Sequence, residues 1–383
     1  MPIELKQFHP AGDKAELKRF VSLPFALHAQ DPVWVPPLRL QVRDDLDTKK
    51  NPFYKHAEIA LWNVYQDGKH VGRIAAVHDE RHNEFHGDNL GFFGFFECID
   101  DPSVAQRLFD AAESWVKKRG LSAIRGPANP SFNHPCGLQV SAFEREPYVM
   151  MPQNPPYYAG LLERLGYLKV KDLLAYEMQS ELGGGGFPER MVKLADRVNR
   201  RNKIVYRPIN MKRFKQDIQA IKDIYNSAWE KNWGFVPMDD AEFDHMAKSM
   251  KDVIWPEFCL IAEIEGEPIA FSVTLPDINQ VLKTIPNGKL LPFGIFKLLL
   301  GIRPVKGKVT QARVITLGVK EKYRPTGVAS LLFYETYRRS PALGVLRGEM
   351  SWILEDNVAM RGAAEMMGGG PAYKTYRVFE KSL

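Results

Sequence analysis

The stretch ARVITLGVKEKYRPTGVAS, residues 312–330, decides the fold of this 383-residue chain. It begins with a run of β-forming residues at 313–319, passes through a short charged turn and continues into the helix-like segment GVASLLFYETYRR. Between the predicted strand and the predicted helix stand Arg324, Gly327 and Ala329, in the pattern R-x-x-G-x-A. A glycine-containing turn that opens a helix presents several backbone N–H groups and the positive end of the helix dipole. The stretch therefore predicts an anion-binding cradle that suits a pyrophosphate.

The elements that follow this cradle come in an informative order. Residues 347–355 alternate in polarity like a strand, and Asn357 then opens the helical segment NVAMRGAAEMM, which ends at the glycines 368–370. A last strand is predicted over residues 373–379. Neither G-x-G-x-x-G nor G-x-x-x-x-G-K-S/T occurs in the sequence, which argues against a Rossmann or P-loop interpretation.

In its motif and in this order of elements, the chain resembles the GNAT superfamily of acyl-CoA N-acyltransferases. Asn357 and Gly368 keep the spacing that the family shows after its pyrophosphate motif. The resemblance implies acyl-CoA as co-substrate, no metal, and an amine acceptor that attacks the thioester directly. It also implies that backbone amides at Leu317 and Val319 hold the thioester. The other CoA-binding residues would be Arg324, Thr326, Gly327, Val328, Ala329 and Asn357.

The residues for proton transfer depart from the family pattern. In many GNAT enzymes a tyrosine on the helix after the asparagine protonates the leaving thiolate, but the corresponding residue here is Ala364. The nearby phenols are Tyr323, Tyr373 and Tyr376, of which we predict Tyr376 as the acid. Glu349 and Glu355 share one face of their predicted strand, so either carboxylate is a candidate general base. An exposed strand edge with glutamates would show the same pattern.

The first half of the chain repeats the order of elements faintly. Two strands surround an Asp67–Gly68 hairpin turn, a third covers residues 90–99, and a helix is predicted over 103–119. The turn before that helix is DDPS, residues 100–103, with two carboxylates and no glycine. Two negative charges there would repel a pyrophosphate. We therefore expect the first half to lack a CoA site and to wall off the acceptor side.

These observations predict an α+β/α protein with two GNAT-like domains in tandem, each a mixed, mostly antiparallel sheet flanked by helices. A degenerate domain without a pyrophosphate loop would occupy residues 1–182. A linker and a basic helix would follow over 183–204, beginning at the glycine run 183–186. The domain that binds acyl-CoA and catalyses transfer would occupy residues 205–383.

Composition sets limits on the function. The chain is 45% apolar and 26% charged, an ordinary globular composition, and its net charge is +6. Such a charge favours anionic partners, among them CoA, a membrane surface and nucleic acid. The basic segment 190–215 lacks the interleaved aromatic residues of single-strand nucleic-acid binding, so a solvated helix and no nucleic-acid partner are predicted. The polar start and the absence of any run of about 18 apolar residues predict a cytoplasmic protein.

An apolar insertion interrupts the second half. Residues 290–302, LLPFGIFKLLLGI, are flanked by Lys289, Arg303 and further lysines, and the run is too short to span a bilayer. One interpretation is core packing against the first domain. The other is contact with a fatty-acyl chain or with the inner face of the membrane, in which Phe293 and Phe296 would bind a lipid substrate. Trp233 and Phe235 are candidates for the acceptor pocket, with domain-core packing as the alternative.

The whole chain also resembles a bacterial group of tandem-GNAT proteins, some of which are similar to bacterial ceramide synthases. The segments NWGFVP, LPDIN, SWILEDNVAM and YKTYRVFEK carry this likeness. It implies N-acylation of a lipid amine such as sphinganine by a long-chain acyl-CoA. The alternative function is a non-catalytic GNAT-like module that binds acyl-CoA or a lipid.

Two further segments carry weaker signals. His78, His82 and His86 lie four residues apart, but the stretch ends in Gly-Asp-Asn, so a polar loop is predicted rather than a metal-binding helix. Residues 126–138, GPANPSFNHPCGL, have the composition of a rigid loop. His134 and Cys136 within it are not evidence of a catalytic pair, and an acceptor site is the second interpretation. The three cysteines show no C-x-x-C spacing, which argues against a disulfide framework or a zinc ribbon.

Overall fold

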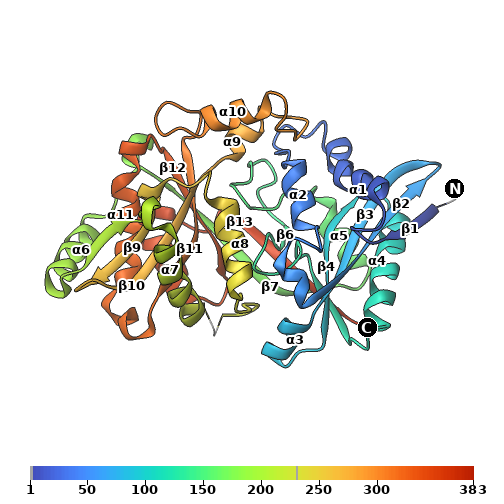
Figure 1. Ribbon diagram of the computed structural model, residues 1–383, viewed down its shortest axis with the longest axis horizontal. Helices are drawn as coiled ribbons and strands as arrows, with labels where there is room; N and C mark the ends of the chain where they lie inside the picture. The colour runs from blue at the N-terminus through green and yellow to red at the C-terminus, as the bar shows by residue number, and fades with distance from the viewer. Residues whose placement is uncertain (1–2, 230–231) are drawn as a thin grey trace. The chain divides into compact units, whose positions relative to one another are not determined.

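The computed structural model describes residues 3–229 and 232–383, and the chain divides into two compact units (Figure 1). Unit 1 comprises Met1–Leu173, Ile285–Pro292 and Thr375–Leu383, and unit 2 comprises Leu174–Thr284 and Phe293–Lys374. This division differs from the predicted one at 1–182, 183–204 and 205–383 in two ways. The first boundary lies within a strand and not in the glycine-rich linker, and the final strand belongs mostly to unit 1. Strand pairing between residues far apart in the sequence produces both differences.

Unit 1 is built on a mixed sheet with the strand order β1-β2-β3-β4-β5-β13-β7, and β6 pairs with β13. The pairs β1–β2, β2–β3, β3–β4 and β5–β13 are antiparallel, and β4–β5 is parallel. The strands are β1 (Ile3–Phe8), β2 (Ala57–Gln66), β3 (Lys69–Asp79), β4 (Leu90–Cys98), β5 (Ala123–Gly126), β6 (Leu138–Gln139), β7 (Leu168–Gln179) and β13 (Lys374–Ser382).

Five α-helices accompany this sheet: α1 (Lys14–Leu27), α2 (Arg39–Asp45), α3 (Glu80–His86), α4 (Pro102–Lys117) and α5 (Tyr157–Arg164). The helix α4 buries its apolar stripe, which recurs at helical spacing, against the sheet. Leu108 and Phe109 of α4 pack there with Trp62, Ile74 and Phe93 of the strands. This cluster forms the main core of unit 1.

Local sequence signals explain two turns of unit 1. The β2–β3 hairpin turns at Asp67 and Gly68, whose φ values of 51° and 76° fit the predicted two-residue turn. The predicted polar loop after β3 is wrong, because the structure forms the helix α3 there. Asp79 caps its first turn by accepting a hydrogen bond from the His82 amide, and Gly87 ends it at φ 65°.

Unit 2 contains the strand order β7-β12-β11-β10-β9-β8, to which β7 contributes its second half. Its further strands are β8 (Val205–Pro208), β9 (Cys259–Ile264), β10 (Glu267–Pro276), β11 (Gln311–Val319) and β12 (Arg347–Leu354). Its helices are α6 (Glu189–Asn202), α7 (Phe214–Trp229), α8 (Asp240–Met250), α9 (Asn279–Leu282), α10 (Gly294–Gly301), α11 (Val328–Arg339) and α12 (Val358–Ala364).

Helices cover both faces of this second sheet. On one face, α7 packs its Ile221 and Ile224 against Phe271 of β10. On the other face, α11 packs its Leu331 and Leu332 against Ala270, so α7 and α11 enclose β10 and β11 (Figure 1). The α6 helix joins the α11 side, where its Ala195 is fully buried. This arrangement places the end of β11, the start of α11 and the helix α6 around one region.

Candidate active site

Two neighbouring strands of unit 2 pair over only part of their length. The strands β11 and β12 run parallel, with residue pairs from Gln311↔Arg347 to Val314↔Met350. Beyond that rung β11 continues to Val319 and β12 to Leu354, but no further pairs join them among the described residues. The two strands therefore separate at their carboxyl ends, which leaves one edge of β11 without a strand partner.

The amides of Leu317 and Val319 point to this unpaired edge. Lys320 donates its backbone N–H to Ile269 at 3.0 Å, which lies on the β10 side of β11. Successive residues of a strand direct their N–H groups to alternate edges, so Leu317 and Val319 face away from β10. A bulge at Ile315 separates this part of β11 from the paired part, since Val314 and Thr316 are matched to consecutive residues of β10. The amides of Leu317 and Val319 thus face the edge of β11 that β12 leaves unpaired, and their contact with a thioester stays a prediction.

The loop between β11 and α11 leads directly to a helix start. A 3₁₀ turn, Glu321–Thr326, ends at Gly327, whose φ of 78° favours glycine. The first bond of α11 is donated by Leu331 to Gly327 at 3.3 Å. The amides of Val328, Ala329 and Ser330 therefore precede the hydrogen-bond ladder of the helix and lie at the positive end of its dipole. The Val328 amide already donates to the Thr326 hydroxyl at 3.4 Å. Such a helix start is an anion-binding arrangement.

The side chains of the motif stabilise the loop itself. Thr326 donates its hydroxyl to Tyr323 at 2.6 Å, which closes the turn. Arg324 donates from Nη2 to the carbonyl of Ala228, near the end of α7, at 3.0 Å and is otherwise exposed. In this structure Arg324 thus contacts a helix carboxyl end. The donors that the loop offers to an anion are then its backbone amides, and their binding of a pyrophosphate stays a prediction.

A cavity of about 480 Å³ lies beside this loop. Thr326, Gly327 and Ser330 line one side of it, and Arg201 and Asn202 at the end of α6 line another. The sequence predicted a solvated basic helix here and missed these two residues. The available signal was the run of arginines at the end of α6, but only the fold shows that α6 packs on α11. Arg201 brings a positive charge to the cavity, as a site for phosphate groups requires.

A buried polar cluster lies where β11 and β12 are last paired. Glu349 is 1% exposed, and the Nε atom of Arg313 lies 3.5 Å from its Oε1 atom. The hydroxyl of Tyr373 donates to the Glu349 carboxylate, and Arg313 Nε donates to Ser351 at 2.6 Å. Burial raises the pKa of Glu349 although Arg313 opposes the shift. A buried carboxyl group with a raised pKa, in contact with a phenol, is a candidate for proton transfer.

Glu349 points to the face that α7 covers. Its neighbour Met350 packs with Phe333 of α11 and Ala364 on the opposite face, and side chains alternate along a strand. Ala364 is fully buried in that cluster, so the position of the family's usual tyrosine belongs to the core here. The acid must therefore come from another residue if the thiolate is protonated by a side chain.

The remaining predicted residues have different surroundings. Asn357 caps α12 by accepting a hydrogen bond from Met360 at 3.1 Å. Glu355 is partly exposed, and its carbonyl accepts from Arg361 at 2.8 Å. Tyr376 is fully buried within the unit 1 part of β13, whereas Tyr373 lies in unit 2 with the separated strands.

The predicted substrate-binding aromatics do not gather in one place. Phe235 is buried and packs on Tyr225 of α7 with ring centroids 5.5 Å apart, which is the core-packing alternative. Trp233 is partly exposed, while Glu230 and Lys231 of the same segment lie outside the described residues. Phe293 and Phe296 are exposed on the surface of unit 2. The prediction that they bind a lipid stays open, but they do not form part of the core.

Unit 1 has the same strand separation, and its own residues fill it. The parallel pairing of β4 and β5 ends at Phe92↔Arg125. Beyond it, Ala128 donates its amide to Phe93 at 2.9 Å, and the Phe95 amide donates to the Asn129 side chain at 2.5 Å. The loop predicted over residues 126–138 therefore lies along β4. The loop thereby fills the edge of β4 that corresponds to the unpaired edge of β11 in unit 2.

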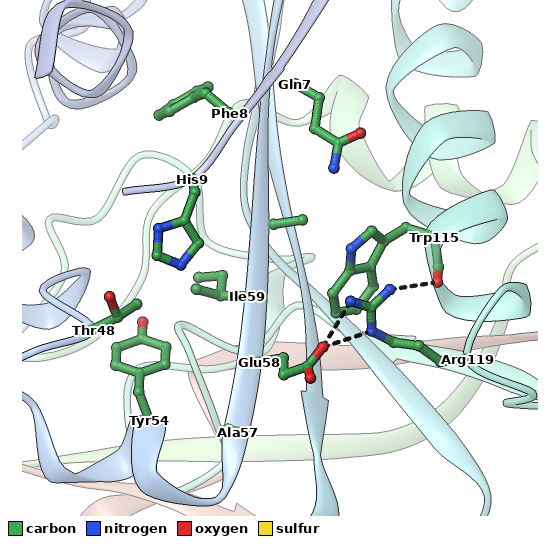
Figure 2. Close-up of a pocket in the computed structure, with 11 residues that line it drawn as sticks. Gln7, Phe8, His9, Thr48, Tyr54, Ala57, Glu58, Ile59, Trp115 and Arg119 are labelled. Atoms are coloured by element: carbon green, nitrogen blue, oxygen red, sulfur yellow. Dashed lines mark hydrogen bonds and ion pairs between the residues drawn. The ribbon is translucent and has the colours of Figure 1, made fainter. Parts of the chain in front are cut away.

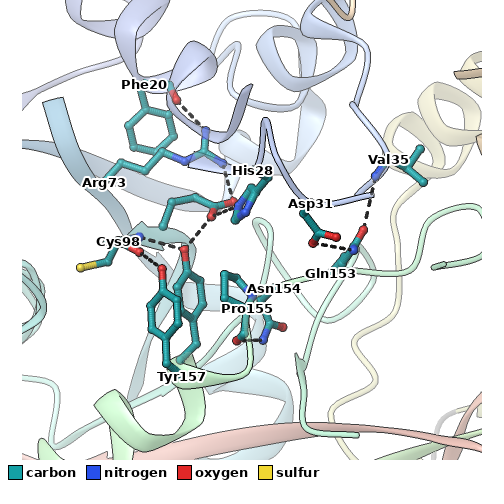
Figure 3. Close-up of polar contacts among 12 residues, drawn as sticks. Phe20, His28, Asp31, Val35, Arg73, Cys98, Gln153, Asn154, Pro155 and Tyr157 are labelled. Carbon is teal, nitrogen blue, oxygen red and sulfur yellow. Dashed lines mark hydrogen bonds and ion pairs between the residues drawn. The ribbon is translucent and has the colours of Figure 1, made fainter. Parts of the chain in front are cut away.

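The start of α4 in unit 1 is also occupied. Asp101 caps this helix by accepting from the Ser103 amide at 2.8 Å, so a carboxylate already stands at the anion-binding position. Figure 3 shows a further filled region at the end of β4, where His28 and Tyr158 each bond Glu97 at 2.8 Å. Burial opposes ionisation of Glu97, but these bonds and the nearby Arg73 hold its pKa below the usual range. These contacts favour the prediction that unit 1 binds no CoA, which stays a prediction.

A hollow of about 590 Å³ lies on β2 of unit 1 (Figure 2). Its cation, Arg119, donates to Glu58 at 2.9 Å from Nε and at 2.7 Å from Nη2, and stacks on Trp115. The charge is therefore neutralised within the protein. Within residues 3–229 and 232–383, no group of three or more His, Cys, Asp or Glu side chains is arranged to hold a metal ion.

Comparisons with known proteins identify the family and the fold. No protein-family model matches the chain. It is 41% identical to protein YghO of Escherichia coli (strain K12) over 376 residues, 97% of this chain and 94% of that protein. It is 40% identical to the bacterial ceramide synthase of Caulobacter vibrioides over 382 residues, 98% of this chain and 97% of that enzyme. A tandem GNAT protein from the clavulanic acid biosynthesis pathway, 12% identical, matches with a TM-score of 0.58 over 100% of this chain and 98% of its own. The predicted fold, two GNAT-like domains in tandem, is thereby confirmed.

Proposed function

Because the chain belongs to the tandem GNAT family of acyl-CoA-dependent N-acyltransferases that includes the bacterial ceramide synthase, we propose that unit 2 acylates a lipid amine with a long-chain acyl-CoA. A sphinganine-like base, which would yield a ceramide, is the proposed acceptor. One observation carries the proposal: the R-x-x-G-x-A loop opens α11 beside the unpaired edge of β11. The identity of 40% over 98% of the chain supports the substrate class.

The proposed reaction forms one C–N bond and breaks one C–S bond. The amine attacks the thioester carbonyl, loses a proton and becomes an amide, while the CoA thiolate leaves and gains a proton. The amides of Leu317 and Val319 would donate to the carbonyl oxygen as negative charge develops on it. One donor of this kind contributes about 3 kcal/mol to the transition state. The reaction needs no metal ion, since backbone dipoles supply the polarisation.

The cavity beside the loop would hold the phosphate groups of CoA. We assign the amides of Val328, Ala329 and Ser330 to the pyrophosphate, because they precede the α11 ladder. Arg201 would add a charge-assisted contact from α6. Asn357 would contribute from the start of α12, where its side chain also caps the helix.

Proton transfer has four candidate groups, two carboxylates and two phenols. Glu349 is the proposed base, since it is buried with a raised pKa on the face that α7 covers. Tyr376 remains the acid predicted from sequence, and Tyr373 joins it because its hydroxyl already contacts Glu349. Glu355 stays a second candidate base. A positioned acid or base of this kind contributes roughly 10²–10⁴-fold to the rate.

A thiol-release assay tests the proposal with two donors and two acceptors. Acetyl-CoA and palmitoyl-CoA are each offered with sphinganine and with a water-soluble polyamine, and the amide product is identified by mass spectrometry. We expect palmitoyl-CoA with sphinganine to give the highest kcat/KM, since each buried methylene contributes about 0.8 kcal/mol. A preference for acetyl-CoA and the polyamine would refute the lipid substrate. Thiol release without any amide product would refute N-acyl transfer itself.

A further inference from the structure

A short helix of unit 2 presents apolar side chains to solvent. The α10 helix and its first flanking residue expose Phe293 by 72%, Phe296 by 62%, Leu299 by 48% and Leu300 by 54%. Val305, in the loop that follows, is 67% exposed. Scattered apolar residues are common on protein surfaces, but several on one short element mark an interaction site.

The opposite face of α10 fixes the helix in place. Leu298 and Gly301 are buried, and a Cβ atom at Gly301 would lie 2.7 Å from Val281 of α9. The α10 and α9 helices are therefore in close contact, as Figure 1 shows. At the end of α10 the indole of Trp255 donates to the carbonyl of Ile302 at 2.8 Å. The exposed apolar side chains thus belong to a well-anchored helix.

The segment that carries this surface has charges of one sign. Between Ile278 and Gln311 the sequence carries six Lys or Arg residues and no Asp or Glu. The members of this set in unit 2 that flank α10 or lie on it are exposed: Lys297, Arg303, Lys306 and Lys308. Basic residues beside exposed aromatic and aliphatic side chains are the composition of interfacial membrane-binding helices.

The charge also selects among partners. A second copy of the chain would bring the same positive residues together, which is unfavourable. An anionic bilayer offers negative head groups to the basic residues and an acyl boundary to the aromatic ones. Within the described part of the chain, no helix combines the length and apolar character needed to cross a bilayer. Contact at the surface of the bilayer is the mode that this surface fits.

We propose that α10 and the loop to Lys308 dock unit 2 on an anionic lipid bilayer, with Phe293, Phe296 and Leu299 inserted among the acyl chains. Binding of this kind requires neither CoA nor an acceptor, so it goes beyond the proposed acyl transfer. It would bring the protein to the phase in which water-insoluble amines reside.

Vesicle flotation tests the docking directly on the full chain. Vesicles of phosphatidylcholine alone are compared with vesicles of equal parts phosphatidylglycerol and phosphatidylcholine, at low and at high salt. We expect flotation with the anionic vesicles only, and weaker flotation at high salt. The double substitution Phe293→Ser and Phe296→Ser should lower the partition coefficient at least tenfold, which corresponds to about 1.4 kcal/mol.

Two further variants separate docking from misfolding. Lys306→Gln with Lys308→Gln leaves the apolar side chains intact and should lower partitioning onto anionic vesicles roughly tenfold. Leu168→Ser removes a residue of unit 1 that is 72% exposed and should leave flotation unchanged. Thermal unfolding of each variant confirms that it is folded.

Three results would overturn the docking proposal: no flotation of the unaltered protein, equal flotation of the phenylalanine variant, or equal binding to neutral vesicles. A concentration-dependent dimer that Phe296→Ser disperses would assign the surface to a second copy instead. Flotation does not depend on catalysis. The flotation results therefore test membrane docking even if the protein has no acyltransferase activity.

Discussion

Replacing Gly327 by Glu is the sharpest test of the CoA site. Gly327 has a φ of 78° and directly precedes α11, and a Cβ atom there would meet no protein atom within 4 Å. The substitution therefore places a carboxylate at the helix start without a clash inside the protein. Gly327→Ala is the matched control, because it imposes the same backbone conformation without the charge.

Both variants lose stability through backbone strain, but only the glutamate repels the pyrophosphate. An L-residue at this φ costs about 1–2 kcal/mol in stability in both variants. The glutamate recovers about 0.3–1 kcal/mol of that through the helix dipole, so it should be at least as stable as the alanine. Toward a pyrophosphate, a carboxylate about 5 Å away at an effective dielectric constant near 20 adds about 3 kcal/mol of repulsion. That repulsion corresponds to more than about 100-fold in affinity.

Titration calorimetry with CoA measures the difference. We expect Gly327→Glu to lose binding by more than about 100-fold, while Gly327→Ala loses much less and both unfold at similar temperatures. Unchanged CoA affinity in a folded Gly327→Glu protein would refute the placement of the pyrophosphate at α11. Equal losses in the two variants would show that close approach of the backbone, and not charge, governs the site.

Three more predictions concern proton transfer, acid stability and the filled site of unit 1. Tyr373→Phe and Tyr376→Phe separate the two candidate acids. Because the Tyr373 hydroxyl contacts Glu349, we expect Tyr373→Phe to lower kcat at least tenfold with KM for acyl-CoA unchanged, and Tyr376→Phe to lower kcat less than twofold; the reverse pattern would identify Tyr376 as the acid. Burial lowers the pKa of His82 to about 4, so between about pH 6.5 and pH 4 the native state binds fewer protons than the unfolded state. The free energy of unfolding therefore falls as the pH falls through this range. In urea unfolding at pH 4.5, His82→Gln should avoid roughly 2–3 kcal/mol of that loss. Asp101→Asn keeps the cap of α4 but removes its charge. Because Ala128 and Asn129 still fill the edge of β4, calorimetry should find one CoA per chain. A stoichiometry of two would contradict the prediction that unit 1 binds no CoA.

Local patterns predicted the elements whose signals are local. The β2–β3 hairpin forms at the predicted turn, since the Asp67–Gly68 pair favours it locally. The polar composition of residues 80–86 predicts a loop, but the end signals Asp79 and Gly87 outweigh it and the segment forms the helix α3. The α1 helix carries Pro24 in its interior, which obscures a helical pattern.

In the candidate site, too, the residues that could be predicted are those whose signals are local in the sequence. The loop around Gly327 could be predicted because strand, turn and helix start are contiguous in the sequence. The contribution of Arg201 could not, since it depends on α6 packing against α11, more than a hundred residues later in the chain. The Glu349–Tyr373 contact likewise depends on long-range placement that periodicity does not encode.

The return of residues Thr375–Leu383 to unit 1 affects the order in which the protein can mature during synthesis. Phe379 belongs to the core of unit 1, and Glu380 and Lys381 form ion pairs with Arg125 and Glu113. While a ribosome is still translating unit 2, unit 1 therefore lacks a core residue and the strand partner of β5. The unit that is made first is the last to be completed, and its open β5 edge needs protection from other chains for most of the time of synthesis.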